Sequence, residues 1–145
     1  MRVPEIVLRK TVTVHRGRSQ SEMLQATGCR GHFVACDITI PPGEGEEVEV
    51  CFFRIRATPT RFIPTLMESV GISPDGYTIG AVVEDDPSIL SQEIGLLTQW
   101  GEEYLLFSEE RNGEKVYDMG RRHAAWSSGL LVGGVIKNKV AGCNG

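Results

Sequence analysis

Hydrophobic and polar positions alternate most clearly in residues 45–56, GEEVEVCFFRIR, which we predict to be the central strand of a sheet. β-branched and aromatic residues favour strands, and prolines and glycines bound the segment. The alternation changes phase in the middle, because Val50 shares a face with Phe52, whereas Phe53 shares the opposite face with Ile55. Either both faces of the sheet are covered here, or a bulge adds one residue and keeps a single face buried.

Three further segments have the pattern of strands. Residues 5–15 alternate and predict a half-buried strand. Residues 33–40 predict a strand or an extended segment. Residues 129–136, GLLVGGVI, are apolar on both faces and predict a buried strand, in which Gly133 and Gly134 mark a bulge or a point of close approach.

The first helical signal covers residues 19–27. Ser19 or Ser21 is the expected N-terminal cap, since a serine hydroxyl can accept a hydrogen bond from a free amide of the first turn. Gly28 then provides the expected stop. This segment therefore predicts a short helix directly after the first strand.

Later helical signals are weaker. Residues 60–70 predict a helix that ends at Gly71, because one stripe at helical spacing is apolar, namely Ile63, Leu66, Met67 and Val70. Residues 74–84 are ambiguous, since helical spacing there competes with two glycines. Asp86, followed by a proline, predicts the N-terminal cap of a third short helix that ends at Gly95.

A hairpin is predicted over residues 103–110 and 114–119, which flank Asn112 and Gly113. Asn-Gly is typical of a two-residue type I′ turn, because both residues adopt positive φ at low cost. Together, these segments predict one α+β domain with a mainly antiparallel sheet and two or three short helices on one face. We expect this domain to span residues 1–137, followed by a flexible tail.

Composition narrows the class of protein. The chain has 145 residues, of which 41% are hydrophobic and 23% charged, and this argues for one folded domain and against disorder. The net charge of −4 and the lack of a basic tract argue against nucleic-acid binding. No apolar run reaches about 18 residues, so we expect no membrane span. With no apolar signal region and no CxxC pair, the four cysteines suggest a cytoplasmic protein with free thiols.

The order of the motifs is similar to a known group of proteins. Residues 11–40, with VTVHRGRSQSEMLQATG and then CDIT, precede the acidic strand EEVEVCFF and the helical segments with their Asp-Pro pair. The hairpin, Trp126 and an apolar strand that ends in Lys137 complete the pattern. In this order the chain resembles uncharacterised short proteins of environmental bacteria and candidate phyla, similar to proteins carried on integron gene cassettes.

That resemblance implies an α+β fold and a mobile-element setting, but no activity and no catalytic residue, because none is assigned to the group. The chain also departs from the pattern. It has fewer tryptophans near its C-terminus, and it continues beyond Lys137 with residues 138–145. A site built from such tryptophans would be weakened here.

A metal site and an acidic site are the first two constellations to weigh. Cys29, His32 and Cys36 can each bind zinc, but a fourth ligand is missing nearby unless Cys51 supplies it, so we expect no metal and no cofactor. The run from Glu84 to Asp86 offers adjacent carboxylates for acid–base chemistry. Helix capping by Asp86 and the attraction of acids to a helix N-terminus explain the run equally simply, and we favour that explanation.

The preferred candidate binding site follows the hairpin. Arginine beside an aromatic ring makes a platform for anions or nucleotides in some proteins, and loops at the end of a sheet often carry binding residues. The alternative is that Arg121, Arg122 and His123 form only a basic loop between strands. Trp100 and Tyr104 either line the same cleft or belong to the core. The expected ligand-binding residues are Arg121, Arg122, His123, Trp126, Trp100 and Tyr104.

Three functions remain open. No nucleophile motif and no phosphate-binding loop is present, which favours a non-enzymatic binding or interaction module with a small-molecule or protein ligand. The first alternative is a small hydrolase that uses Glu84, Asp85 and His123. The second is a toxin, antitoxin or immunity-type partner protein.

The strand over residues 6–14 also predicts self-association. Only Arg9 and Lys10 protect it as an edge strand, and an unprotected edge invites pairing with a second copy. We therefore expect a two-fold homodimer. The competing expectation is a monomer, in which residues 130–136 cover this edge and Trp126 closes the second face of the sheet.

Overall fold

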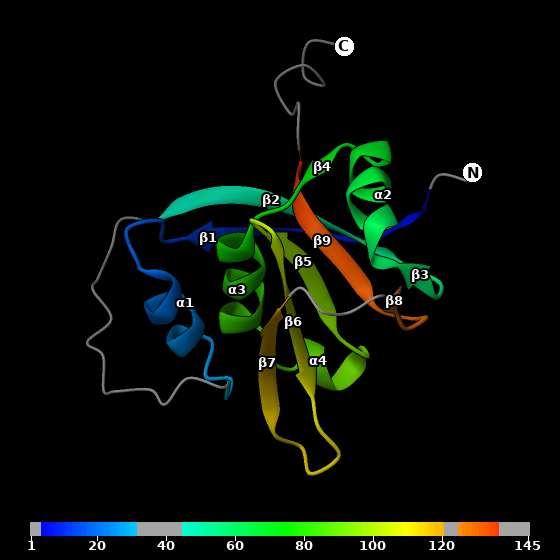
Figure 1. Cartoon of the computed structure of the whole chain (residues 1–145). Coiled ribbons are helices and arrows are strands. Elements are labelled where there is room, and N and C mark those ends of the chain that lie inside the picture. Colours follow the sequence, from blue (N-terminus) through cyan, green and yellow to red (C-terminus); the bar gives the residue numbers. More distant parts are fainter. Residues whose placement is uncertain (1–3, 32–44, 121–124, 137–145) are drawn as a thin grey trace.

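A seven-stranded mixed sheet forms the middle layer of the chain (Figure 1). The computed structural model describes residues 4–31, 45–120 and 125–136. Six strands follow the order β1-β2-β9-β5-β6-β7, and β4 pairs separately with β9. Their bounds are β1 Ile6–Val14, β2 Glu46–Arg54, β4 Ile72–Ser73, β5 Leu96–Trp100, β6 Glu103–Glu109, β7 Lys115–Gly120 and β9 Leu131–Ile136. A small second sheet pairs β3 (Thr58–Pro59) with β8 (Ala125–Trp126).

The predicted α+β class is confirmed. β5 and β9 run parallel, whereas the other strand pairs of the described residues are antiparallel. The helices are α1 (Gln20–Ala26), α2 (Ile63–Ser69), α3 (Gly76–Asp85) and α4 (Ile89–Gln92), and a short 3-10 helix, η1 (Thr60–Phe62), leads into α2.

The centre of the sheet differs from the predicted one. β9 pairs with β2 along one edge and with β5 and β4 along the other, so β9 is the most enclosed strand. β2, which we expected at the centre, lies between β1 and β9. The expectation that residues 130–136 cover the edge of β1 is therefore wrong, because β9 inserts on the far side of β2.

The phase change in β2 reflects cover on both faces of the sheet. Phe52 packs in a cluster with α3 residues, whereas Phe53 packs in a second cluster with α2 residues, and both side chains are fully buried. Burial of a side chain of this size contributes about 1.5–3 kcal/mol. The register shift lies between Ile6 and Leu8 of the partner strand β1, so β2 needs no bulge of its own.

Helices cover the two faces unequally (Figure 1). The first cluster includes residues of α1, α3 and α4, which agrees with the predicted two or three helices on one face. The second cluster includes Ile63 and Met67 of α2 together with Trp126 of β8. This fourth helix and the small second sheet close the face that would otherwise expose Phe53.

Most predicted helix ends are confirmed. Ser19 caps α1 in a capping box, because its hydroxyl accepts from the Glu22 amide at 3.1 Å while the Glu22 carboxylate accepts from the Ser19 amide at 2.7 Å. Gly28 and Gly71 follow α1 and α2 with φ of 75° and 76°. The ambiguous segment is the helix α3, and its N-terminal cap is Asp75.

The predicted cap of the following helix is wrong. Asp86 is the C-terminal cap of α3, since its amide donates to the Val82 carbonyl at 3.0 Å, and its carboxylate accepts from the Ser88 hydroxyl. α4 begins after Ser88 and ends at Gln92 rather than at Gly95. Because α3 extends to Asp85, Asp86 lies between two helices, and its carboxylate bonds to Ser88 instead of capping the N-terminus of α4.

The predicted hairpin is present as β6 and β7, but its loop is one residue longer than a type I′ turn. The Gly113 amide donates to the Glu110 carbonyl at 2.8 Å, and the Glu110 amide donates to the Glu114 carbonyl at 2.8 Å. The loop is therefore 111–113, with Gly113 at φ 84°. A three-residue loop with glycine in the left-handed region is the next most common hairpin connection.

Candidate functional site

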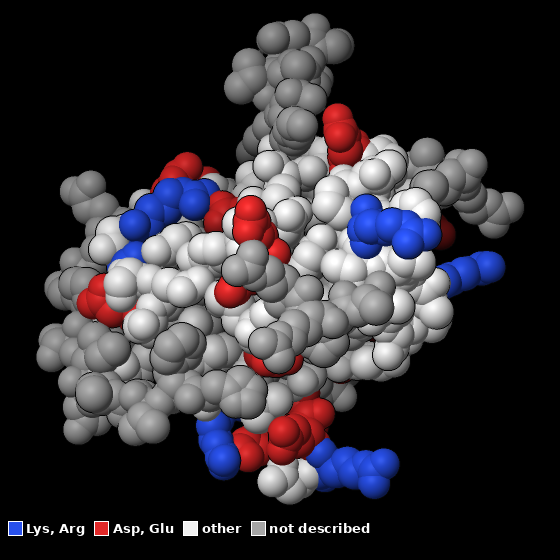
Figure 2. Space-filling view, viewed as in Figure 1, with Lys and Arg blue, Asp and Glu red and all other residues white. Residues whose placement is uncertain are grey.

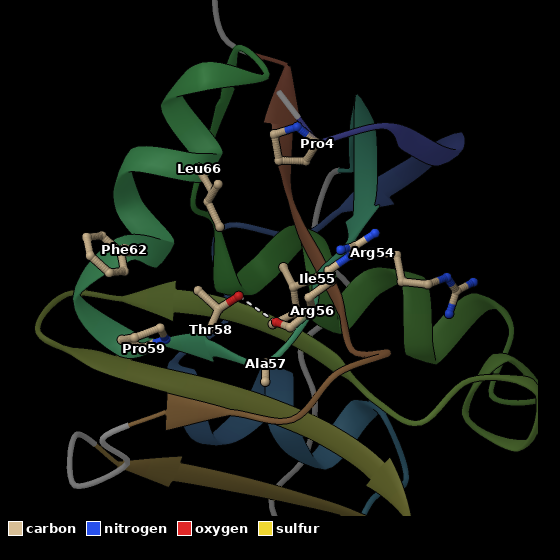
Figure 3. A pocket seen from close by; sticks show the side chains of 9 residues that line it. All are labelled: Pro4, Arg54, Ile55, Arg56, Ala57, Thr58, Pro59, Phe62 and Leu66. Carbon is tan, nitrogen blue, oxygen red and sulfur yellow. Dashed lines mark hydrogen bonds between the residues drawn. The ribbon is translucent and has the colours of Figure 1, made fainter. Parts of the chain in front are cut away.

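The α2 pocket is an apolar cavity of about 480 Å³ where β2 leaves the sheet and the chain turns into α2 (Figure 3). A volume of this size falls within the range of about 300–1,000 Å³ typical of small-molecule sites. The described residues that line it are Pro4, Arg54, Ile55, Arg56, Ala57, Thr58, Pro59, Phe62 and Leu66.

The turn that forms this pocket is held by backbone hydrogen bonds. The Ile55 amide donates to the Leu130 carbonyl at 3.0 Å, and the Ile55 carbonyl accepts from the Gly129 amide at 2.8 Å. The Thr58 hydroxyl donates to the Arg56 carbonyl at 2.5 Å, as Figure 3 shows. The pairing of β3 with β8 continues this support, so the pocket wall is fixed on both sides of Arg56.

Apolar side chains form the opposite wall. Leu66 of α2 is half-buried and packs against the second core cluster, and Figure 3 shows it on the helix that faces Ile55 and Arg56. Phe62 of η1 remains 37% exposed at the same end of the molecule. The pocket therefore offers apolar surface that the fold itself does not fill.

Two of the arginines that surround the pocket differ in their charge partners. Arg54 donates to the Glu93 carboxylate at 2.9 and 3.3 Å and to the Gly129 carbonyl at 3.2 Å, and the bond to Glu93 raises the pKa of Arg54. Arg56 is exposed, and its guanidinium has no hydrogen bond or ion pair with any other described residue. Arg56 is thus the cation at this pocket whose charge the described residues leave uncompensated.

A further arginine adds positive charge nearby. The guanidinium of Arg61 lies 4.8 Å from the centre of the Phe62 ring, within the distance of a cation–π contact. Figure 2 shows that the surface around α2 is mostly uncharged, with lysine or arginine atoms beside the helix and aspartate or glutamate atoms at its upper end, whereas charges of both signs gather around the β6–β7 loop. The α2 pocket therefore combines apolar surface with positive charge.

The residues predicted as a binding platform are only partly described. Arg121, Arg122 and His123 lie outside the described residues, so their role stays a prediction. Trp126 and Tyr104 are 5% and 6% exposed, and their ring centres lie 5.8 Å apart in the second cluster. Both rings therefore belong to the core beneath β3 and α2 and do not form an open surface.

Trp100 lies on the other face of the sheet. It packs against the first cluster, with its ring centre 5.0 Å from that of Tyr77, and lines a separate cavity of about 370 Å³ beside the start of α3. The sheet separates Trp100 from Tyr104, so the two rings do not line one cleft.

The acidic run serves the structure of α3. Glu84 pairs with Arg18 at 2.9 Å, and Asp85 pairs with Lys10 at 3.6 Å. Asp86 bridges to Ser88, as described above. Each carboxylate thus has a local partner, which agrees with the structural explanation that we favoured from the sequence.

The described thiols are buried. Cys29 and Cys51 are free cysteines, and burial raises the pKa of each thiol, which opposes formation of a reactive thiolate. His32 and Cys36 lie outside the described residues, so the expectation of no zinc stays a prediction. Within the described ranges, no group of three histidine, cysteine or acidic side chains is placed to hold a metal ion.

Sequence reasoning did not single out the α2 pocket. In the sequence, Arg54 and Arg56 fit the polar positions of an alternating strand, and such alternation is the pattern of any half-buried strand. The available signal was an Arg-x-Arg segment that ends a strand just before Pro59 and continues into an exposed aromatic residue. Such a signal is weak without the fold that brings α2 against it.

No protein-family model, curated protein or solved structure significantly matches this chain. Among the helices of the described residues, none is long and apolar enough to cross a membrane.

Proposed function

We propose that this chain is a non-enzymatic binding module whose ligand site is the α2 pocket. The observation that supports this most is the chemistry of the pocket lining. No histidine, cysteine or acidic residue is among the described residues that line it, and the hydroxyl of Thr58 donates to the Arg56 carbonyl. A preformed apolar cavity without an acid–base pair or a nucleophile suits binding rather than catalysis.

The neutral fluorescent probe N-phenyl-1-naphthylamine tests this proposal. Its emission rises in an apolar site, so we expect saturable binding to the folded chain. Leu66→Trp fills the pocket and should weaken binding at least about five-fold, which corresponds to roughly one lost apolar contact of about 1 kcal/mol. Thr65→Trp adds the same side chain at an exposed position of the same helix and should leave binding unchanged.

Circular dichroism and the thermal midpoint should be the same for both variants, so that a loss of binding is not a loss of fold. Saturable probe binding that both variants retain would place the site elsewhere. No binding of the probe by the wild-type chain would refute the α2 pocket as a ligand site.

We also propose that the chain forms a homodimer through β1. β1 is an edge strand of the sheet, with β2 as its neighbour on one side among the described strands. A two-fold pairing of two β1 strands would join two sheets into one. Light scattering tests this pairing, since a dimer has about twice the 15.9 kDa mass of the chain.

A cytoplasmic location is consistent with the described thiols, and we propose it on that basis. Cys29 and Cys51 are free and buried in the core, and such thiols persist in a reducing compartment. Fractionation of cells that produce the chain, followed by detection with an antibody, tests this location directly.

A further inference from the structure

We propose that the α2 pocket takes an amphiphilic monocarboxylate, with its apolar chain in the cavity and its carboxylate on Arg56. This inference rests on the proposed function of the pocket as a ligand site, and it adds the chemical class of the ligand. The ligand is a single small molecule with one anionic end and one unbranched apolar end.

Charge complementarity selects an anion. Glu93 already neutralises Arg54, whereas Arg56 has no counter-charge among the described residues, and no carboxylate lines the described pocket wall. Arg61, above the Phe62 ring, adds a second positive charge at the same end. An anion is attracted to such a site, whereas a cation is repelled by both arginines.

The chemistry of arginine favours a carboxylate among anions with an apolar tail. A planar guanidinium donates two parallel hydrogen bonds to the two oxygens of a carboxylate. Arg56 is well placed to do so because its backbone is already held by the Thr58 hydroxyl, between Ile55 and the strand β3. Binding therefore orders one side chain rather than a loop, which lowers the entropic cost.

The apolar lining of the pocket determines the second feature of the ligand, an apolar chain. The lining consists mostly of proline, alanine, isoleucine, leucine and phenylalanine carbon, and the cavity of about 480 Å³ has room for a medium-length alkyl chain. Each methylene buried from water should tighten binding about four-fold until the cavity is full. Chain length is therefore an independent readout of the same site.

Decanoate, decanol and decyltrimethylammonium form a matched set of probes with one chain length and three head charges. We expect amide shifts at Ile55, Arg56 and Leu66 in a nitrogen-15 NMR titration of the full chain, with decanoate binding more tightly than decanol and decyltrimethylammonium binding least. Arg56→Gln should weaken decanoate about five-fold, the size of a partly exposed ion pair, and leave decanol unchanged. Arg111→Gln removes an exposed arginine from the β6–β7 loop and is the matched control.

The head-group set separates this inference from the proposed function. Equal affinity for decanoate and decanol at these amides would overturn the anionic class while the pocket stands as an apolar site. Failure of every probe, including N-phenyl-1-naphthylamine, would overturn both.

Octanoate and dodecanoate test the dependence of affinity on chain length. Vesicles test whether a lipid surface, rather than a free carboxylate, provides the anionic head and the apolar chain. Affinity that does not rise from octanoate to decanoate would contradict burial of the chain in the cavity. Arg56-dependent sedimentation with phosphatidylglycerol vesicles, without binding of monomeric decanoate, would overturn the small-molecule ligand in favour of a lipid surface.

Discussion

At the scale of single residues, two glycines of β9 allow neighbouring groups to pack closely against this strand on both faces of the sheet. A Cβ at Gly133 would collide with the Phe52 ring and lie 2.8 Å from Ile79, and a Cβ at Gly134 would collide with the Ser73 carbonyl. The sequence predicted a bulge or a close approach at this pair. The register across β2 is continuous here, so close approach is the reason for the glycines.

Gly133→Ala should therefore destabilise the fold by about 1–3 kcal/mol, the usual cost of adding a methyl group to a filled core. Urea unfolding measures this as a lower midpoint with an unchanged slope. Gly120→Ala is the control, because a Cβ at Gly120 meets nothing within 4 Å. The control should be neutral or slightly stabilising, since alanine restricts the unfolded chain. Equal midpoints for the two variants would show that the core can move aside.

The roles of single residues could be predicted where packing produces a recognisable sequence pattern, and could not be predicted where it produces none. The change of phase at Phe52 and Phe53 predicted either two covered faces or a bulge, and the burial of both rings in opposite clusters shows that the faces are covered. No such pattern distinguishes Arg56 from the other polar positions of the segment. Its proposed role in binding an anion depends on the missing counter-charge around its guanidinium, and that follows only from where Glu93 and α2 lie in the fold.

At the scale of elements, the capping box of α1 is the most testable local signal. The sequence allowed Ser19 or Ser21 as the cap, and the structure shows that Ser19 makes both reciprocal bonds with Glu22. Ser19→Ala should destabilise the fold by about 1 kcal/mol, because an amide of the first turn loses its acceptor. Ser21→Ala should be neutral or slightly stabilising, because alanine is the better helix former.

Thermal and urea unfolding of the two serine variants give this comparison directly. A larger loss of stability for Ser21→Ala than for Ser19→Ala would show that Ser19 is not the cap that stabilises α1.

Element prediction was weakest where the local pattern was short. β5, with the sequence LLTQW, was not predicted, because five residues with adjacent leucines match neither strand alternation nor a helical stripe. Its two leucines face the two opposite core clusters, as the phenylalanines of β2 do. α4 has only four residues, and its misplaced cap shows that Asp-Pro can end one helix as readily as it starts the next.

At the scale of the whole molecule, strand order is the feature that the sequence could not supply. Hydrophobic alternation predicts which segments are strands, but β9 pairs with strands from distant parts of the chain. Its place between β2 and β5 depends on contacts that no local window contains. That order leaves β1 at one edge of the sheet, and the dimer proposal depends on this edge.

The other edge strand is less open to pairing. Arg30 already bonds to β7, through its amide to the Lys115 carbonyl at 2.9 Å and its carbonyl to the Tyr117 amide at 2.8 Å. On β1, by contrast, the two protective charges are partly neutralised within the chain. Arg9 pairs with Glu49, and Lys10 lies 3.6 Å from Asp85. Neutralised charges protect an edge less well against a second strand.

Symmetry excludes some registers of this pairing and favours one centred on Thr11. A two-fold axis through Lys10 or Arg9 would place like charges directly opposite each other, which is unfavourable. An axis through Thr11 places Thr11 opposite the partner's Thr11, and Lys10 opposite the partner's Val12. In this register neither cation faces another, and a threonine pair lies at the centre, an arrangement that stabilises antiparallel strands.

Thr11→Lys should therefore dissociate the dimer, because it places two lysines opposite each other on the axis. Light scattering at micromolar concentration should give about twice the 15.9 kDa chain mass for the wild type and close to the chain mass for this variant. Thr65→Lys makes the same change on the exposed surface of α2 and should remain dimeric. A wild-type mass near 15.9 kDa would exclude the dimer. A Thr11→Lys variant that stays dimeric would exclude the register centred on Thr11, because two opposed ammonium groups at the distance of a cross-strand pair are unfavourable.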